Sequence, residues 1–432
     1  MKQSHYNSIV SIGDRTLLFN ALSLNFIVIP KEIESNFLEL LDKPDYDWGH
    51  LEIMRNQLIE KQFIIPNYVD EYSIIQKRIS EGKKKKHYAL MLLPTYSCNL
   101  SCWYCVQRHN DDIMSEQLIS SIKRHIMNYL QVNNIKSFEI HWFGGEPMLC
   151  FESHIIELSR FAIEVCDNLG VKFFNNITTN GSLMDINRII LMRDLRFMQF
   201  QITIDGARDT HNLTRNHDGE PTFNLITNQI KNILEIIPEA QVYLRYNFTA
   251  ENFSEIDELI QQLNITFSKH IRGNIKVSPV KVWQEKRANL PDDCFEQIYT
   301  KFKTAGYDLA DADMCHDFTK CIADMKHSHV VFPNGYVDKC NNIDPQEARY
   351  RLFDNGDIKL RNSNIIESTL DEIPASCMIC RSFPACLGPC WKFKNYAVKT
   401  SGYIKCMDSM ANIGIKERIR NFCILKLIES KI

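Results

Sequence analysis

The sequence predicts an α/β protein built around a parallel sheet, preceded by a small α+β unit and followed by a cysteine-rich segment. Short apolar runs alternate with helical stretches from residue 88 onward. Residues 1–86 have a different order, with strands first and helices after. Eight of the fifteen cysteines lie between residues 315 and 406. A chain of 432 residues suits two or three domains.

Residues 1–86 form the first predicted unit. Three short strand candidates are separated by turn residues, and three amphipathic stretches follow them: "NSIVSIG", "TLLFNAL" and "LNFIVIP", then "KEIESNFLELL", "HLEIMRNQLIEKQF" and "YSIIQKRIS". Gly82 and the four lysines at 83–86 end the pattern. We interpret the lysines as a solvated linker rather than a nucleic-acid patch, because their surroundings are neutral.

Residues 87–309 form the second predicted unit. Six apolar runs read as strands: "YALMLLPT", "FEIHWFGG", "FFNNITTN", "MQFQITID", "VYLRYNFT" and "IKVSPVKVW". Helical stretches lie between them, as at 116–130, 154–169 and 223–237. About six β-α units predict a parallel sheet, open or barrel-like, with ligands at the C-terminal ends of its strands. The rhythm stops near residue 310; a turn-rich segment at 310–410 and one amphipathic helix at 411–432 are expected beyond it.

Composition excludes several classes of function. The formal net charge is -3, which gives no bulk attraction to nucleic acid or acidic lipid. The polar N-terminus does not resemble a secretory signal, and no apolar run approaches the roughly 18 residues of a membrane helix. We therefore expect a cytoplasmic protein that binds neither nucleic acid nor membrane. Clustered cysteines in a reducing compartment indicate metal rather than disulfides.

The stretch "YSCNLSCWYC" follows the first strand of the second unit and contains Cys98, Cys102 and Cys105. A closed zinc site needs four ligands, and the spacing of nearby His109 matches no common zinc signature. The pattern C-x3-C-x2-C, with Trp103 after the second cysteine, resembles the signature of the radical S-adenosylmethionine (radical SAM) enzymes. That resemblance implies a partial (β/α)6 TIM-type barrel, and three thiolates that bind a [4Fe-4S] cluster. The fourth iron would bind S-adenosylmethionine, which is cleaved to a 5'-deoxyadenosyl radical.

Three further stretches resemble motifs of the same family. "WFGGEPML" resembles the GGEP element that contacts the methionine amino group, and "TTNGSL" and "QITIDGARDTHNLTR" close the next two strands. Taken alone, each could be an ordinary turn. The resemblance implies that S-adenosylmethionine is contacted by Tyr104, Gly144, Gly145, Glu146, Pro147, Asn180, Thr203 and Arg215.

The second cysteine cluster centres on "CMICRSFPACLGPC", with the spacing C-x2-C-x5-C-x3-C. Spacing alone also permits two structural zinc sites. The pattern resembles the SPASM domain of peptide-modifying radical SAM enzymes, which implies two auxiliary [4Fe-4S] clusters and three clusters in all. The first would be bound by Cys315, Cys321, Cys340 and Cys390, and the second by Cys377, Cys380, Cys386 and Cys406. Four cysteines fall outside both patterns: Cys150, Cys166, Cys294 and Cys423.

The N-terminal unit carries the information on substrate. Its order of elements resembles the winged-helix-like recognition element of ribosomal-peptide (RiPP) maturases, which binds a leader peptide as an added strand. "LNFIVIP" would be the template strand and "YSIIQKRIS" the flanking helix, although the unit could also be a plain structural cap. Asn341 follows Cys340, where sulfatase-maturating relatives have an aspartate proposed as a base; an amide cannot accept a proton in that role.

These resemblances predict a radical SAM maturase that installs an intramolecular thioether or carbon–carbon crosslink in a precursor peptide. Two auxiliary clusters suit such a net oxidation. The expected partners are the precursor peptide and an electron donor such as flavodoxin or ferredoxin. A peptide epimerase is the alternative within the family. A metal-bearing peptide-binding module without catalysis is the alternative outside it.

Overall fold

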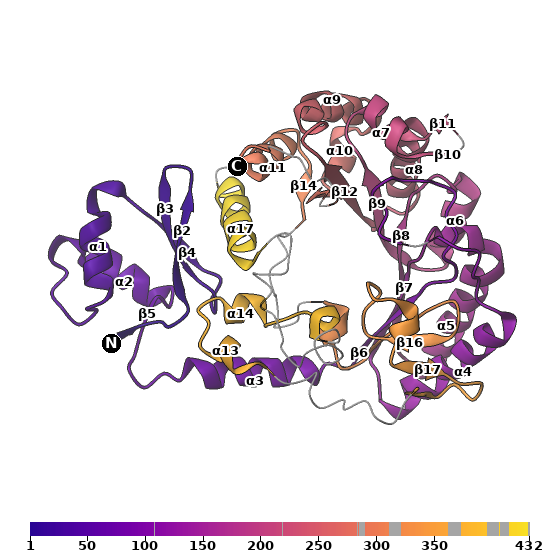
Figure 1. Ribbon diagram of the computed structural model, residues 1–432, viewed down its shortest axis with the longest axis horizontal. Coiled ribbons are helices and arrows are strands. Elements are labelled where there is room, and N and C mark those ends of the chain that lie inside the picture. Colours follow the sequence, from indigo (N-terminus) through magenta and orange to yellow (C-terminus); the bar gives the residue numbers. More distant parts are fainter. Residues whose placement is uncertain are drawn as a thin grey trace. The chain divides into compact units, whose positions relative to one another are not determined.

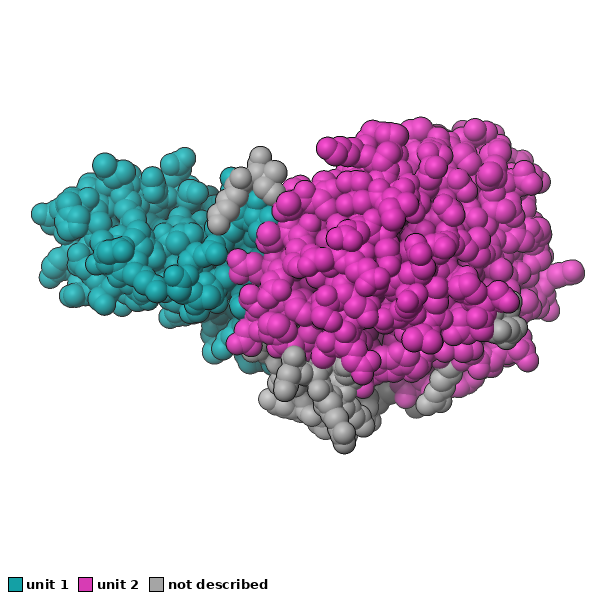
Figure 2. Space-filling view, turned by 90° about the horizontal axis from the view of Figure 1, so that it is seen from above, with its two compact units in different colours: residues 1–85, 311–326, 366–432 teal, residues 86–310, 327–365 magenta. Residues whose placement is uncertain are grey.

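The computed structural model describes residues 1–107, 109–217, 219–282, 284, 290–310, 321–361, 373–394, 406 and 414–430. The chain divides into two compact units (Figure 2). Unit 1 comprises residues 1–85, 311–326 and 366–432, and unit 2 comprises residues 86–310 and 327–365. Among the described helices, none is both long and apolar enough to cross a membrane.

Unit 2 contains an 11-stranded sheet of order β14-β13-β12-β9-β8-β7-β6-β15-β16-β17-β18. The strands from β6 to β14 in this order run parallel to their neighbours, which confirms the predicted parallel sheet. They include all six predicted strands: β6 (His87–Leu92), β7 (Ser137–Trp142), β8 (Lys172–Thr179), β9 (Phe197–Ile204), β12 (Gln241–Phe248) and β13 (Ile275–Lys281). The short edge strand β14 (Asp308–Leu309) completes this part.

Helices line the outside of the curved sheet (Figure 1). They are α4 (Glu116–Val132), α5 (Ile156–Leu169), α6 (Ile186–Asp194), α7 (Arg208–Thr214), α8 (Phe223–Ile236), α9 (Ile256–Thr266), α10 (Lys269–Arg272) and α11 (Cys294–Thr304). Local signals set their limits: the Ser115 side chain caps α4 by accepting from Leu118 N–H, and α5 ends at Gly170 with φ +64°. On β7 the buried Phe138 and Ile140 alternate with half-buried polar residues, so only one face of the sheet is apolar.

Four short strands extend the sheet beyond the predicted ones. β15 (Ser328–Val331) pairs parallel with β6. β16 (Tyr336–Asp338), β17 (Tyr350–Leu352) and β18 (Ile358–Leu360) follow as antiparallel neighbours. Strands of three or four residues are too short to show a period in the sequence.

A buried ion pair joins β16 to the start of β17. The Arg349 and Asp338 side chains are 2% and 0% exposed, with Nη2 and Oδ1 3.2 Å apart. Arg349 also donates its backbone N–H to Asp338 Oδ2 at 3.0 Å. Because Asp338 lies two residues before Cys340, this pair fixes the backbone that leads to one of the predicted cluster ligands.

The N-terminal part of unit 1 has the predicted order of elements. A three-stranded antiparallel sheet, β2 (Asn7–Ile12), β3 (Arg15–Asn20) and β4 (Phe26–Ile29), is followed by α1 (Glu34–Leu41), α2 (Glu52–Glu60) and α3 (Glu71–Lys83). Leu18 and Ile29 pack into one core with Phe37, Trp48 and Leu58. Two further strands, β1 (Lys2–Gln3) and β5 (Ile64–Ile65), pair with each other.

The C-terminal part of unit 1 contains α13 (Ala375–Met378), α14 (Phe383–Cys386) and α17 (Ile415–Glu429). We expected one amphipathic helix at the C-terminus. The helix is present, but it is not one-sided, because five consecutive residues from Asn421 to Leu425 are buried. It packs against the N-terminal sheet, where the Phe19 and Phe422 rings lie 6.1 Å apart in an edge-to-face arrangement.

Replacing Arg349 should strongly destabilise unit 2. Arg349→Leu removes the guanidinium from the buried Asp338 carboxylate, and the free energy of unfolding should fall by about 3–5 kcal/mol. Urea unfolding of the metal-free protein measures it. Arg196→Leu is the control, since its ion pair with Asp167 is exposed and should be worth less than about 1 kcal/mol. Equal losses in the two variants would contradict this account.

Candidate functional site

The cysteine loop lies between the end of β6 and α4. Its base is closed by an isolated bridge between Thr95 and Ile113, and by a hydrogen bond from Tyr96 N–H to the Asp112 carbonyl. Cys98 and Cys102 are half-buried. Burial raises the pKa of the Cys102 thiol to about 11, and the neighbouring thiols of Cys98 and Cys105 contribute to the increase. Within the loop, Cys105 N–H donates to the Cys102 carbonyl at 3.0 Å, and shared ligation of one cluster by the three thiols remains a prediction.

The next strand end packs on the backbone of this loop. Gly145 donates its N–H to the Thr95 carbonyl at 3.1 Å, and Glu146 donates its N–H to the Ser97 carbonyl at 2.8 Å. A Cβ atom on Gly145 would lie 2.2 Å from the Ser97 carbonyl oxygen. Gly144 has φ +126°, and a Cβ there would lie 2.5 Å from the Thr95 carbonyl oxygen. Both glycines thus allow the second strand end to contact the segment that enters the cysteine loop.

The Glu146 carboxylate is fully buried and bonded within the protein. Oε1 accepts from Met148 N–H at 2.9 Å and from the Thr179 hydroxyl at 2.8 Å, while Oε2 accepts from Asn180 N–H at 2.7 Å. Burial raises its pKa, although these hydrogen bonds oppose the increase. Pro147 is the buried first residue of the 3-10 turn that Glu146 caps. Glu146 therefore joins the end of β7 to the end of β8.

Asn180 connects β8 to the cysteine loop. Its Nδ2 donates to Asn99 Oδ1 at 2.8 Å and lies 3.9 Å from Cys98 Sγ. Its Oδ1 accepts from Ser182 N–H at 2.8 Å. Thr203 lies on β9, in register with Arg245 on β12 and two residues before Asp205. The predicted contacts of Asn180 and Thr203 with S-adenosylmethionine remain predictions.

A buried triad connects the loop to β9 and α7. The Tyr104 hydroxyl donates to Asp205 Oδ2 at 2.5 Å and accepts from Arg215 Nη1 at 2.8 Å. The Asp205 and Arg215 side chains are 3% and 9% exposed, with Oδ2 and Nη1 3.7 Å apart. Burial raises the pKa of Asp205, and the Arg215 charge opposes the increase. A charged pair at this depth holds Tyr104, and with it the third cysteine, in one position.

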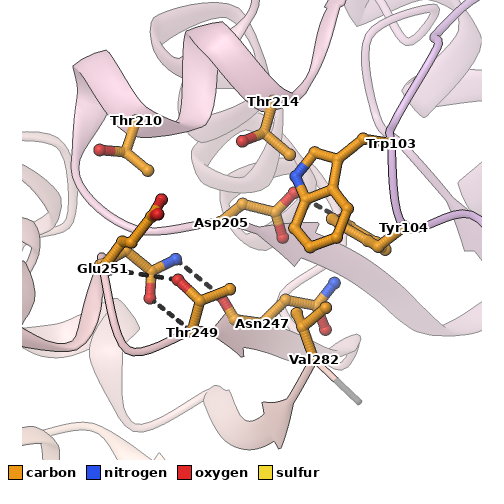
Figure 3. A pocket seen from close by; sticks show the side chains of 10 residues that line it. Trp103, Tyr104, Asp205, Thr210, Thr214, Asn247, Thr249, Glu251 and Val282 are labelled. Carbon is orange, nitrogen blue, oxygen red and sulfur yellow. Dashed lines mark hydrogen bonds between the residues drawn. The ribbon is translucent and has the colours of Figure 1, made fainter. Parts of the chain in front are cut away.

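A pocket of about 360 Å³ opens beside Tyr104 (Figure 3). Its lining includes Trp103 and Tyr104 from the loop, Asp205 after β9, Asn247 near the end of β12 and Val282 after β13. Asp205 Oδ1 is buried and accepts no hydrogen bond within the described part of the chain, and Asn247 lines the same pocket. The pocket therefore presents an acceptor group next to an aromatic surface at the C-terminal ends of the strands.

The second set of cysteines lies in part outside the described residues. Cys315 is not described, Cys321 and Cys390 belong to unit 1, and Cys340 belongs to unit 2, so this ligand set remains a prediction. The pKa of Cys377 is raised by burial and then by the neighbouring thiols of Cys386, Cys380 and Cys406. These four are the residues assigned by resemblance to the second auxiliary cluster, and this ligand set also remains a prediction.

No three His, Cys, Asp or Glu side chains of the described chain lie in an arrangement that could hold a single metal ion. His109 Nε2 lies 3.4 Å from Cys105 Sγ, although the spacing of His109 from the cysteines matches no common zinc signature. A four-iron cluster is larger than one ion, so its ligands lie further apart.

Comparison with known proteins identifies this architecture. Residues 92–263 match the family model described as the Radical SAM superfamily. Residues 92–263 therefore carry a radical SAM domain. A radical SAM domain implies a [4Fe-4S] cluster and S-adenosylmethionine, and Cys98, Cys102 and Cys105 lie within the matched residues. No curated protein sequence matches the chain.

Solved structures of the protein anSMEcpe share the fold of this radical SAM chain. Native anSMEcpe with bound AdoMet and Kp18Cys peptide aligns with a TM-score of 0.55 at 14% identity, covering 80% of this chain and 99% of that one. Native anSMEcpe with bound AdoMet aligns with a TM-score of 0.53 at 15% identity, covering 79% and 97%. SuiB of Streptococcus suis bound to precursor peptide SuiA aligns more weakly, with a TM-score of 0.49 at 16% identity, covering 93% and 97%.

Sequence reasoning missed two residues of this site, Asp205 and Gln284. Asp205 lies in the quoted "TIDG" stretch, but only Thr203 and Arg215 were assigned from that region. Its signal was available, since an Asp-Gly directly after a parallel strand places a carboxylate at the edge where ligands bind. Gln284 was also missed. Its Nε2 donates to the Tyr104 carbonyl at 2.5 Å, across the loop from Asp205.

Gly145→Ala should displace the cysteine loop. The added methyl group would overlap the Ser97 and Tyr96 carbonyl oxygens, and we expect the anaerobically reconstituted protein to lose about four irons per chain. Iron analysis and the electron paramagnetic resonance spectrum of the reduced protein measure the loss. Gly273→Ala is the control, because nothing lies within 4 Å of its added Cβ. Full iron content and an unchanged spectrum in Gly145→Ala would refute the packing role.

Proposed function

We propose that this radical SAM enzyme is a maturase of a ribosomally made precursor peptide and installs an intramolecular thioether or carbon–carbon crosslink. The shared fold with anSMEcpe supports action on a peptide, since that protein is known with AdoMet and with Cp18Cys or Kp18Cys peptide bound. At about 15% identity the likeness concerns the fold, and the peptide substrate is our inference.

The observation that carries the proposal is the position of the pocket directly beside the cysteine loop. Cys98, Cys102 and Cys105 would hold the cluster, and the pocket at Trp103 and Asp205 would take S-adenosylmethionine. A volume of about 360 Å³ lies within the usual range of small-molecule sites. With both cofactors bound, the site would supply radical chemistry for hydrogen abstraction from the substrate.

The residues of the chain supply binding and orientation. Asp205 Oδ1 is an acceptor suited to a ribose hydroxyl, and the Trp103 ring suits an aromatic base. The Arg215 charge beside Tyr104 suits a carboxylate. Gly144, Gly145, Glu146 and Pro147 would act chiefly by holding the cysteine loop, and Asn180 by bonding to Asn99 next to Cys98.

The outer edge of β4, which no described strand pairs with, supports leader binding. Asn20 N–H donates to the Asn25 carbonyl, which makes these two opposite residues a hydrogen-bonded pair. In an antiparallel sheet every second pair is hydrogen-bonded, so the residues of β4 that bond to β3 are Ile27 and Ile29. The N–H groups of Phe26 and Val28 therefore point away from β3. Val28 is 41% exposed. An extended leader peptide could add at this edge as a fourth strand.

Two auxiliary clusters, for three [4Fe-4S] clusters in all, would complete the enzyme. They suit a crosslinking reaction, because the substrate radical must lose an electron when the new bond forms. An external donor such as flavodoxin or ferredoxin would deliver electrons in the cytoplasm. Asn341 remains a reason against sulfatase maturation. Epimerisation is the alternative reaction, and a non-catalytic peptide carrier is the alternative function.

The decisive experiment uses the peptide encoded by a short open reading frame beside the gene. We expect the reconstituted enzyme, with S-adenosylmethionine and dithionite, to release 5'-deoxyadenosine and lower the peptide mass by two hydrogens. Cys102→Ala should lose both activities and retain about eight irons. Deuterium uptake from heavy water with no other mass change would mean epimerisation. A wild-type protein that does not cleave S-adenosylmethionine would refute catalysis.

The leader edge can be tested with one substitution. Val28→Pro removes an N–H that points out of the sheet, and binding of the fluorescein-labelled peptide should weaken at least tenfold by anisotropy. Ile9→Pro on β2 is the control. Ala21 N–H donates to the Tyr6 carbonyl, so every second residue from Tyr6 bonds to β3 and the residues between them do not. Ile9 is one of the latter, and its N–H points out of the sheet at the opposite edge. Equal affinities of the two variants would contradict binding at β4.

A further inference from the structure

The loop of the second predicted auxiliary cluster contacts the N-terminal recognition element within unit 1. His5 Nε2 lies 3.1 Å from the Ile379 carbonyl oxygen. Because a carbonyl only accepts, His5 must carry its proton on Nε2 and donate it. The Tyr72 hydroxyl donates to Met378 Sδ at 3.4 Å. Met378 and Ile379 are the two residues between Cys377 and Cys380.

The same contact reaches the buried interior of the N-terminal element. Tyr6 follows His5 and is 2% exposed. Burial and the Glu71 carboxylate raise the pKa of Tyr6 to about 12, and Tyr72 and Cys380 add to the increase. The printed contacts of His5 and Tyr72 therefore bring the cluster loop to the first turn of α3 and to the residue that precedes buried Tyr6.

A chain of hydrogen bonds leads from this contact to the template strand. Glu71 accepts from the Ser4 hydroxyl at 2.5 Å and from His5 N–H at 3.0 Å. Asn20 Nδ2 donates to Ser4 Oγ at 2.8 Å, and Asn20 N–H donates to the Asn25 carbonyl, one residue before β4. Ser4, Glu71 and Asn20 are buried, where such bonds are costly to break.

A second contact route runs over the other face of the sheet. α14, which contains Cys386, packs against α17, and α17 packs against β2. Phe422 of α17 meets Phe19 on β3, which is fully buried. The cysteine-bearing segment thus supports the N-terminal sheet both at the start of α3 and through α17.

We propose that the second auxiliary cluster positions the leader-binding element, with His5 and Tyr72 as positioning residues that join the Cys377–Cys380 loop to it. Loading of this cluster then raises the affinity for the leader peptide, and a chain lacking it binds leader poorly. This role rests on the proposed function. It adds that the position of the leader-binding element depends on the second auxiliary cluster. The cluster has a structural role here, so no electron transfer is needed for the effect.

Hydrogen–deuterium exchange of the reconstituted full-length protein tests the contact without any leader. Cys380→Ser should speed exchange of peptides covering residues 1–12 and 68–80 by about tenfold or more, whereas residues 31–41 should change little. Cys102→Ala is the control, because it removes a predicted ligand of the radical SAM cluster in unit 2. It should leave the exchange rates of residues 1–12 unchanged. Identical exchange of residues 1–12 in Cys380→Ser and wild type would overturn the proposal.

A second variant keeps every cysteine. The double variant His5→Ala/Tyr72→Phe should retain about twelve irons but bind the labelled precursor peptide about tenfold more weakly, since it lacks two hydrogen bonds. His5→Gln, which keeps a donor, should bind close to wild type. Unchanged affinity in the double variant would overturn the coupling. If wild-type protein binds no peptide, leader recognition itself fails, and the exchange experiment still decides the contact.

Discussion

The cysteine loop depends on a contact between two pieces of backbone. Residues 144–146 lie directly on residues 95–97, and two hydrogen bonds join them. Side chains at 144 and 145 would occupy the space of the carbonyl oxygens, so the contact exists only because both residues are glycines. Since β6 and β7 are neighbours in register up to Leu92 and Trp142, the contact continues the sheet beyond its last paired residues.

Buried polar groups then fix the loop at two further strand ends. Asn180 after β8 bonds to Asn99, and Asp205 after β9 bonds to Tyr104. Three successive strand ends therefore hold the loop on its sheet side. Cys105 is exposed. This arrangement places the thiols at the carboxyl ends of parallel strands, where α/β folds bind ligands. The register of the sheet therefore determines where the thiols lie.

The sequence predicted the elements with a clear period and missed contacts that have no local signal. The strands from β6 to β13 were predictable because each is an apolar run between helical stretches. β15 to β18 were not, because three or four residues show no period. The packing of α17 on β2 joins residues about four hundred positions apart, which no window of sequence can reveal. The bonds of Glu146 also lack a local signal, because its buried carboxylate accepts from three protein donors that tertiary packing brings together.

The polar face of the sheet explains how a peptide could reach the radical. In a closed TIM barrel the inner face is packed with branched apolar side chains. Here the inner positions of β7 are Glu139 and His141, which bond to Asn176 and Thr178 of β8 at 2.9 and 3.0 Å. These groups are half-buried or bonded to one another, so the inner face is lined with polar side chains rather than filled with apolar ones. Under the proposed function, an extended peptide can pair with such groups while the strand ends hold the reactive centre in a fixed position. Under the same proposal, the contact of the Cys377–Cys380 loop with α3 would set how firmly the leader peptide is held within unit 1.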